Sequence, residues 1–206
     1  MDVVGITRRL TSADVEAAYR AGIFPMGDPE RGVITWHRPK RRAILPLDSF
    51  HASRSLSALL RRRPFEVTWN RCFADVMDAC ADRPGTWISS EFKTVYGELH
   101  KQSKAHSVEV WMDGELAGGL YGVHLGGAFF AESMFHRRTN MSKVALAELV
   151  SRLRARGFAL LEVQYLTEHL AQFGVIEISD KKYQARLKEA LVRPCGFGSS
   201  ILGSEV

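Results

Sequence analysis

The sequence predicts an α+β fold, in which a mixed β-sheet is flanked by helices, and three stretches of the chain carry this prediction. Residues 108–112 and 115–123 alternate between apolar and polar side chains around Asp113-Gly114, a dipeptide typical of tight hairpin turns. Residues 158–164 form a mostly apolar strand. Between them lies an amphipathic helix, whose apolar face is Leu146, Leu149, Val150 and Leu153.

The composition is that of a globular protein long enough to bury a core, with 206 residues, 46% hydrophobic and 25% charged. No apolar run approaches the ~20 residues that span a bilayer, and the N-terminus lacks the pattern of a signal peptide. We therefore expect no membrane association and a cytoplasmic location. The three cysteines form no C-x-x-C pair, so we expect them to be reduced and structural.

The formal net charge is +5, and the basic residues are clustered. Such clusters either bind a phosphate backbone without reading its sequence or form solvated faces. Composition alone does not decide whether the protein binds nucleic acid. The clusters are Arg8-Arg9, residues 40–42, residues 61–63, Arg137-Arg138, residues 152–156 and Lys181-Lys182.

The first 50 residues predict a short helix and a short strand. Thr11 or Ser12 caps the helix, and residues 33–36 form the strand. Residues 43–47 are extended but contain a proline, which suits a sheet edge or a linker. We place a domain boundary near Phe50.

The next segment alternates helix, strand and two further helices. Ser53 opens a helix that ends at the arginines of residues 61–63, where cations interact favourably with the helix dipole. Residues 65–69 alternate as a half-buried strand. Two helical faces follow, Phe73, Val76, Met77 and Cys80, and then Phe92, Val95, Tyr96 and Leu99. Ser89 or Ser90 caps the second of these helices.

The remaining elements complete an acetyltransferase-like order. We expect a strand over residues 128–132 after Gly126-Gly127, a helix capped by Asn140 or Ser142, the strand of residues 158–164, a helix capped by Thr167, a strand over residues 175–178 and a helix capped by Ser179. A meander followed by helix, strand, helix and strand matches a fold whose mixed sheet splays to admit a substrate. By itself this order indicates no particular activity.

Glu162 and Gln164 interrupt an otherwise apolar strand. Because strand side chains alternate, we expect both on one face. A buried carboxylate and a buried amide both need partners, so the pair indicates either a structural polar network or a functional site.

Three chemistries find no support in the sequence. His100 and His106 lack ligand spacing with cysteine or carboxylate, so we expect no metal site. Ser133 lies in Glu-Ser-Met and not in the G-x-S-x-G turn of serine hydrolases. The glycines of residues 118–122 begin inside a strand, which favours a bulge or a close backbone approach over a phosphate-binding loop.

Several blocks of the chain, from about residue 10 to residue 191, resemble the leucyl/phenylalanyl-tRNA–protein transferase family. Their order and content are highly specific to that family. The matching blocks are residues 21–26, Trp36, residues 50–55, 85–88, 106–111 and 118–123, Gly126, residues 132–135, Asn140, Ser142-Lys143 and Gln164.

The resemblance implies a small N-terminal α/β domain over residues 1–50, packed on an acetyltransferase-like (GNAT) catalytic domain over residues 51–206 that uses neither coenzyme A nor another cofactor. Proteins of this family move leucine, phenylalanine or sometimes methionine from aminoacyl-tRNA to proteins with N-terminal arginine or lysine, which marks the acceptor for N-end-rule degradation. The basic clusters would then hold the tRNA by its backbone. No large apolar face is left unassigned, so we expect a monomer.

The resemblance also implies the binding residues. Phe129 and Met134 would line an apolar pocket for the transferred side chain. Glu132 would hold the amino acid's ammonium or orient the terminal adenosine, which Trp36 and Trp87 would stack on or enclose. The remaining binding residues are Ser133, Thr167 and His169.

At the reacting centre the resemblance implies Gln164, with Glu162 as its support. Orienting the amine and the ester is an easier role for an amide than acting as a strong base. The family usually has aspartate in place of Glu162, and one added methylene shifts a carboxylate by about 1 Å, which can cost on the order of 100-fold in rate. We expect the backbone to compensate. The alternatives are a catalytically weak aminoacyl-tRNA-binding protein and a coenzyme A-dependent acetyltransferase, for which no pyrophosphate loop is visible.

Overall fold

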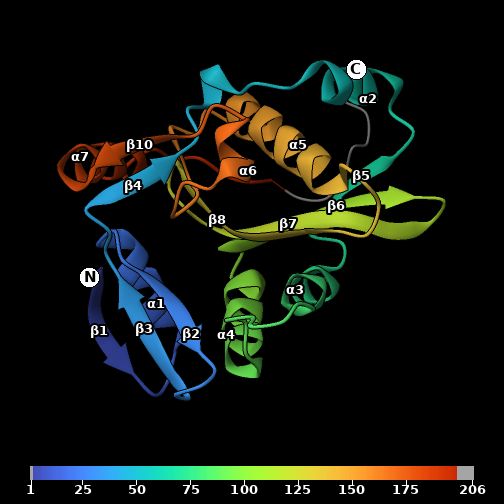
Figure 1. Cartoon of the computed structure of the whole chain (residues 1–206). Coiled ribbons are helices and arrows are strands. Elements are labelled where there is room, and N and C mark those ends of the chain that lie inside the picture. The colour runs from blue at the N-terminus through green and yellow to red at the C-terminus, as the bar shows by residue number, and fades with distance from the viewer. Residues whose placement is uncertain (1, 199–206) are drawn as a thin grey trace.

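The chain folds into two β-sheets with helices packed around them, and the computed structural model describes residues 2–198 (Figure 1). The smaller sheet is antiparallel, with strand order β1 (Val3–Thr7), β3 (Val33–His37), β2 (Phe24–Asp28). Helix α1 (Ser12–Arg20) packs against β2 and against a helix of the remaining chain. The N-terminal segment therefore contacts the rest of the molecule through α1.

The larger sheet has seven strands and carries the candidate site. Their order is β10 (Ile176–Ser179), β4 (Arg41–Ile44), β9 (Leu160–Glu162), β8 (Ala128–His136), β7 (Glu115–Leu125), β6 (Ala105–Met112), β5 (Glu66–Trp69). Among these described strands, β8 and β9 are the parallel pair and all other neighbours are antiparallel. The predicted α+β fold with a mixed sheet is confirmed.

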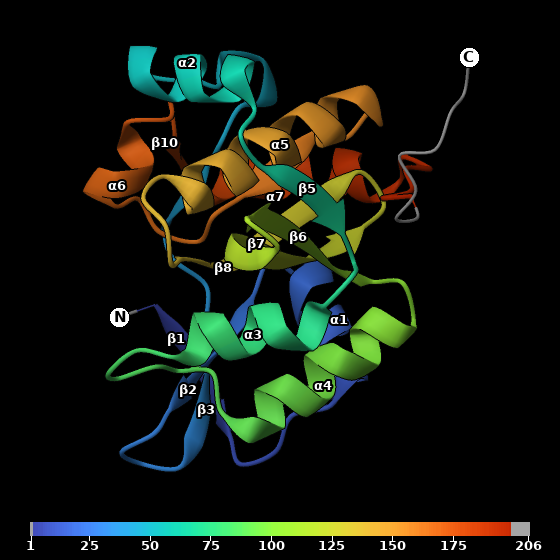
Figure 2. The same cartoon turned by 90° about the vertical axis from the view of Figure 1, so that its right-hand side faces the viewer.

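Helices cover both faces of the large sheet and divide the apolar interior into two cores. They are α2 (Arg54–Arg62), α3 (Phe73–Ala81), α4 (Ser90–Lys101), α5 (Met141–Ala155), α6 (Glu168–Ala171) and α7 (Asp180–Leu191), with a 3-10 turn at Leu47–Ser49. Figure 2 shows α5 and α2 on one side of the sheet and α3 and α4 on the other. None of the described helices is long and apolar enough to cross a membrane.

Capping residues begin most helices where the sequence predicts. Side-chain oxygens accept hydrogen bonds from the first-turn N–H groups at Thr11, Ser53, Ser89, Thr167 and Ser179. Asn140 precedes α5, but its side chain makes no capping hydrogen bond and its φ is 70°. Helix α5 thus begins at the predicted place without the predicted capping bond.

The glycines of β7 mark close approaches, as the sequence predicts. A Cβ at Gly118 would lie 2.6 Å from Cβ of Met141, and a Cβ at Gly122 would collide with the carbonyl oxygen of Phe130. The pairing of β7 with β8 shifts register at Gly122, which is a β-bulge.

The first 50 residues differ most from expectation. Strands β1 and β2 were not predicted, and β2 contains Pro25 and Gly27, residue types that disfavour strands. The prediction of an edge or linker at residues 43–47 is wrong, because β4 pairs with both β9 and β10 and Pro46 lies beyond its end. The domain boundary near Phe50 stays a prediction, although β4 already belongs to the large sheet.

Candidate active site

The candidate active site is a pocket that opens where the parallel strands β8 and β9 separate. The two strands pair from Ala128–Leu160 to Phe130–Glu162. Beyond that point a pocket of about 460 Å³ opens between β8, the chain after β9, the start of α5 and α6. Glu132 and Gln164 line it, each two residues past the last pair, Glu132 on β8 and Gln164 in the turn that follows β9.

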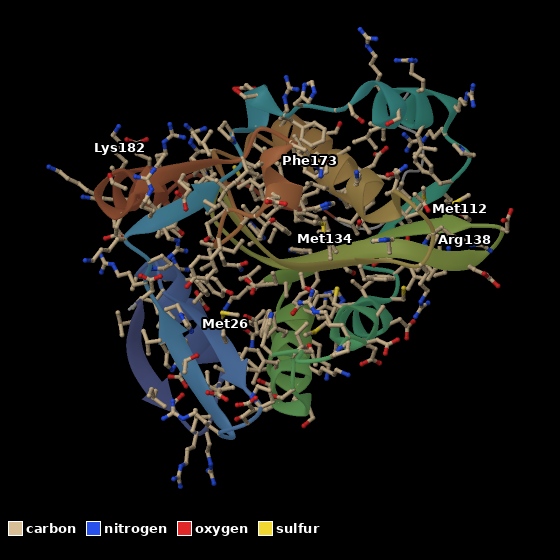
Figure 3. All side chains as sticks on the ribbon, in the orientation of Figure 1. Met26, Met112, Met134, Arg138, Phe173 and Lys182 are labelled. Carbon is tan, nitrogen blue, oxygen red and sulfur yellow. The ribbon has the colours of Figure 1, made fainter. Side chains whose placement is uncertain are left out.

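The pocket wall combines aliphatic and polar side chains. The aliphatic ones include Leu120, Met134, Leu146, Val163 and Leu170, and Met134 projects from β8 on the face that α5 covers (Figure 3). The polar and titratable ones are Arg83, Glu132, Ser133, His136, Ser142, Gln164, Tyr165, Thr167 and His169. Such a wall suits a ligand with an apolar body and polar ends.

Glu132 is the extra residue of the β-bulge in β8. Its neighbours Ala131 and Ser133 pair with consecutive residues of β7, which leaves Glu132 unpaired. Four consecutive residues, 131–134, consequently line the pocket, whereas a regular strand would present every second one. The bulge is what brings the carboxyl of Glu132 to the pocket wall.

Glu132 is 8% exposed, and its carboxyl receives a hydrogen bond on the side away from the pocket. The hydroxyl of Tyr19 donates to Oε1 of Glu132, and the hydroxyl of Tyr96 lies 3.1 Å from that of Tyr19. Burial raises the pKa of Glu132 to about 8, against the hydrogen bond from Tyr19, which lowers it. This carboxyl therefore changes its charge close to neutral pH.

The backbone turns sharply at Gln164, where φ is 58°, a value that few residues other than glycine adopt. The N–H of Tyr165 donates to the carbonyl of Val163 at 2.8 Å, and the N–H of Gln164 donates to Oε1 of Glu162 at 2.8 Å. The prediction that Glu162 and Gln164 share a strand face is wrong. Strand β9 ends at Glu162, and Val163 and Gln164 both line the pocket.

Glu162 is fully buried and pairs with the equally buried Arg42. Nη2 and Nε of Arg42 lie 2.8 and 3.2 Å from Oε1 of Glu162, while Oε2 has no hydrogen-bond partner within residues 2–198. Burial raises the pKa of Glu162, and the positive charge of Arg42 opposes that shift. Arg42 also donates to the carbonyl of Gly22 and lies over the ring of Tyr183. The pair ties the N-terminal segment and α7 to the turn at Gln164.

Six of the ten residues assigned to the site from the sequence line the pocket, namely Glu132, Ser133, Met134, Gln164, Thr167 and His169. Glu162 lies behind Gln164. Trp36 and Phe129 are buried in the two cores, and Nε1 of Trp36 donates to the hydroxyl of Thr7. Trp87 lines a separate hollow of about 460 Å³ beside β2 and β3.

Sequence reasoning missed the partners of both carboxylates and most of the aliphatic wall. Arg42 lies in a basic run whose other members, Lys40 and Arg41, are exposed, and no pattern separates it from them. Tyr19 fits the apolar face of α1. The aliphatic residues fit the core faces of their strands and helices, and only the tertiary arrangement makes them border a cavity.

This fold is of the acetyltransferase-like class, and its pocket lies where two parallel strands of the sheet diverge. The solved structure of FemX has a similar fold, with a TM-score of 0.53 at 12% identity, covering 81% of this chain and 66% of that one. Family profiles identify the chain more narrowly. The profile of leucyl/phenylalanyl-tRNA protein transferase matches residues 44–188, and that of its N-terminal domain matches residues 8–40.

Two curated relatives carry the same family name. The leucyl/phenylalanyl-tRNA–protein transferase of Salinibacter ruber is 55% identical over 174 residues, 84% of this chain and 77% of its own. That of Roseobacter denitrificans is 53% identical over 193 residues, 92% of this chain and 90% of its own. The chain belongs to the leucyl/phenylalanyl-tRNA protein transferase family, and it is an aminoacyltransferase.

Proposed function

We propose that the chain transfers leucine, phenylalanine or methionine from aminoacyl-tRNA to the α-amine of proteins with N-terminal arginine or lysine, and so marks them for N-end-rule degradation. Family membership supports the donor and acceptor classes. The observation that carries the proposal is the pocket that Glu132 and Gln164 line together with aliphatic side chains.

The aliphatic wall suits the side chain of the donor amino acid. Met134, Leu146 and Leu170 offer flexible apolar surface, and a volume of about 460 Å³ is that of a small-molecule site. Burying a leucine, phenylalanine or methionine side chain there contributes roughly 1.5–3 kcal/mol. A polar donor side chain would lose its hydration without replacement.

The reaction needs placement more than activation. The aminoacyl ester is already reactive, and an α-amine with a pKa of about 7.7–8.0 is partly neutral near pH 7. Holding the amine against the ester contributes roughly 7–11 kcal/mol at best. We assign this role to Gln164, because the turn that Glu162 holds aims its amide at the pocket.

The basic surfaces suit the phosphate backbone of the donor tRNA. Arg61 and Arg62 are exposed at the end of α2, and such contacts bind without reading sequence. Trp87 is our candidate for stacking on the terminal adenosine, which is worth about 1–3 kcal/mol, while Trp36 and Phe129 support the binding walls by packing. We place the reaction in the cytoplasm, where charged tRNA is found, with a monomer that needs neither coenzyme A nor another cofactor.

The test is transfer of labelled leucine, phenylalanine and methionine from tRNA to peptides that begin with Arg, Lys, Asp or Glu. Gln164→Ala is assayed beside the parent, with coenzyme A binding measured in parallel. We expect transfer to Arg and Lys peptides, a loss on the order of 100-fold in the variant, and no coenzyme A binding. Transfer to Asp or Glu peptides alone would overturn the acceptor. A lack of any transfer would favour a protein that only binds aminoacyl-tRNA.

A further inference from the structure

Three buried tyrosines surround Glu132 on the side away from the pocket. Tyr19 of α1, Tyr96 of α4 and Tyr121 of β7 are each fully buried. The hydroxyl of Tyr19 donates to Glu132 and lies 3.1 Å from that of Tyr96, and hydrogen bonds from both tyrosines lower the pKa of Glu132 against the effect of burial. The hydroxyl of Tyr121 has no hydrogen-bond partner within residues 2–198. Tyr19 and Tyr96 therefore support the carboxyl of Glu132, and Tyr121 makes no hydrogen bond to it among the described residues.

Other titratable groups face Glu132 without a direct hydrogen bond to it. The negative charge of Glu162 raises the pKa of Glu132, and the positive charge of Arg42 lowers it. Glu162 and Arg42 are themselves an ion pair. Tyr183 lies beside Arg42. On the pocket side the wall carries Arg83, His136, Tyr165 and His169.

We propose that Glu132 is the catalytic residue that accepts the proton of the attacking α-ammonium, and that Tyr19 is its positioning residue. This role rests on the aminoacyl transfer proposed for the same pocket. The ammonium of the acceptor gives one proton to the Glu132 carboxylate, and its nitrogen forms a bond to the ester carbonyl carbon. The bond from that carbon to the ribose oxygen of the tRNA breaks, and the ribose oxygen takes a second proton from the nitrogen. Glu132 then returns its proton to solvent through the pocket.

The pKa of the Glu132 carboxyl and that of the acceptor's α-ammonium are well matched for proton transfer. Proton transfer is most effective when the acceptor's pKa lies near the operating pH, and the pKa of about 8 for Glu132 lies close to that of an α-ammonium. Gln164, in the turn after β9, has an amide that accepts no proton at this pH, so it is left to orient the reactants. The bulge and Tyr19 together fix where the carboxyl points.

The first measurement is the single-turnover rate of phenylalanine transfer from tRNA to an Arg peptide, from about pH 6 to about pH 9.5, in the parent and in Glu132→Gln. We expect the variant to lose on the order of 100-fold near about pH 8, where part of the Glu132 carboxyl is ionised and part of the amine still carries its proton. The parent itself slows toward the acid end, because the protonated carboxyl accepts no proton. The loss should shrink toward the alkaline end, where the amine is already neutral and needs no proton acceptor. Binding of charged tRNA should stay within a few-fold, because the amide has nearly the shape of the carboxyl.

Tyr19→Phe separates positioning from simple packing. Loss of its hydrogen bond removes support for the carboxylate, so the pKa of Glu132 rises and the acid limb of the rate profile moves to higher pH while the plateau remains. Tyr121→Phe is the matched control, since it removes a buried hydroxyl that has no hydrogen-bond partner among the described residues. Its profile should overlay that of the parent.

Three outcomes would overturn the role of Glu132. They are a parent-like rate of Glu132→Gln near about pH 8, a loss of equal size at every pH, and a change in KM alone. If that variant does not fold, identical profiles for Tyr19→Phe and Tyr121→Phe would equally overturn it. No transfer by the parent at any pH would instead refute the proposed function.

Discussion

At the scale of single residues, the ion pair of Arg42 and Glu162 holds the turn that carries Gln164. Both side chains are fully buried, and Oε1 of Glu162 accepts from Arg42 and from the N–H of Gln164. A buried ion pair adds little net stability, but removing one partner leaves an uncompensated charge in the core. The pair therefore acts mainly by fixing the turn at Gln164.

Glu162→Gln should lower the free energy of unfolding by about 3–5 kcal/mol, because it leaves the guanidinium of Arg42 without its counter-charge. Urea unfolding of parent and variant measures the difference. Glu177→Gln is the control, since its pair with Arg41 is exposed and should contribute less than about 1 kcal/mol. Equal effects of the two variants would contradict the structural role of the buried pair.

Glu162→Asp tests whether the longer side chain is accommodated. Glu162 already reaches both Arg42 and the N–H of Gln164, so shortening it should weaken these contacts and slow transfer, on the order of 100-fold for a shift of about 1 Å. The rates of transfer to an Arg peptide decide the matter. An inert parent beside an active variant would show that the chain as it stands only binds aminoacyl-tRNA.

At the scale of elements, the bulge in β8 depends on the absence of a side chain in β7. A Cβ at Gly122 would collide with the Phe130 carbonyl oxygen and the Phe129 ring, next to the unpaired Glu132. The two strands can approach closely there only because Gly122 leaves that space empty.

Gly122→Ala should cost about 1–3 kcal/mol in stability and also reduce transfer, since relief of the collision must displace the bulge. Thermal unfolding and the transfer rate measure the two effects. Gly97→Ala is the matched control, because a Cβ there meets nothing within 4 Å and alanine favours a helix over glycine by about 0.5–1 kcal/mol. If Gly122→Ala behaved like this control, the bulge would not need the glycine.

At the scale of the whole molecule, the arginines at the end of α2 lie away from the pocket. The pocket lies at the splay of the large sheet, whereas Arg61 and Arg62 are exposed on α2, which packs on α5 away from the smaller sheet (Figure 2). Contacts to phosphates release counterions, so they make binding depend on salt.

Arg61→Gln with Arg62→Gln should weaken tRNA binding and reduce the slope of log K against log salt by about 1 for each phosphate that the arginines no longer neutralise. Titration of charged tRNA at several salt concentrations measures the slope. Arg63→Gln is the matched control, because Arg63 is already paired with Glu148 at 2.8 Å. An unchanged slope in the double variant would place the tRNA on another basic cluster.

Most elements from residue 53 onward could be predicted from the sequence, because their signals are local. The Asp113-Gly114 turn, the caps at Ser53, Ser89 and Thr167, and the spacing of apolar residues each act within a few positions of the chain. The resemblance to a family added the residues of the site, six of which line one pocket.

The way these elements combine into a site depends on contacts between distant parts of the chain. Strand β4 entered the large sheet between β9 and β10, and the bulge turned Glu132 toward the pocket. Tyr19 lies 113 positions from Glu132 and Arg42 lies 120 from Glu162, so no local pattern links these partners. Burial in a common core brings them together, and that burial sets the charge of both carboxyls.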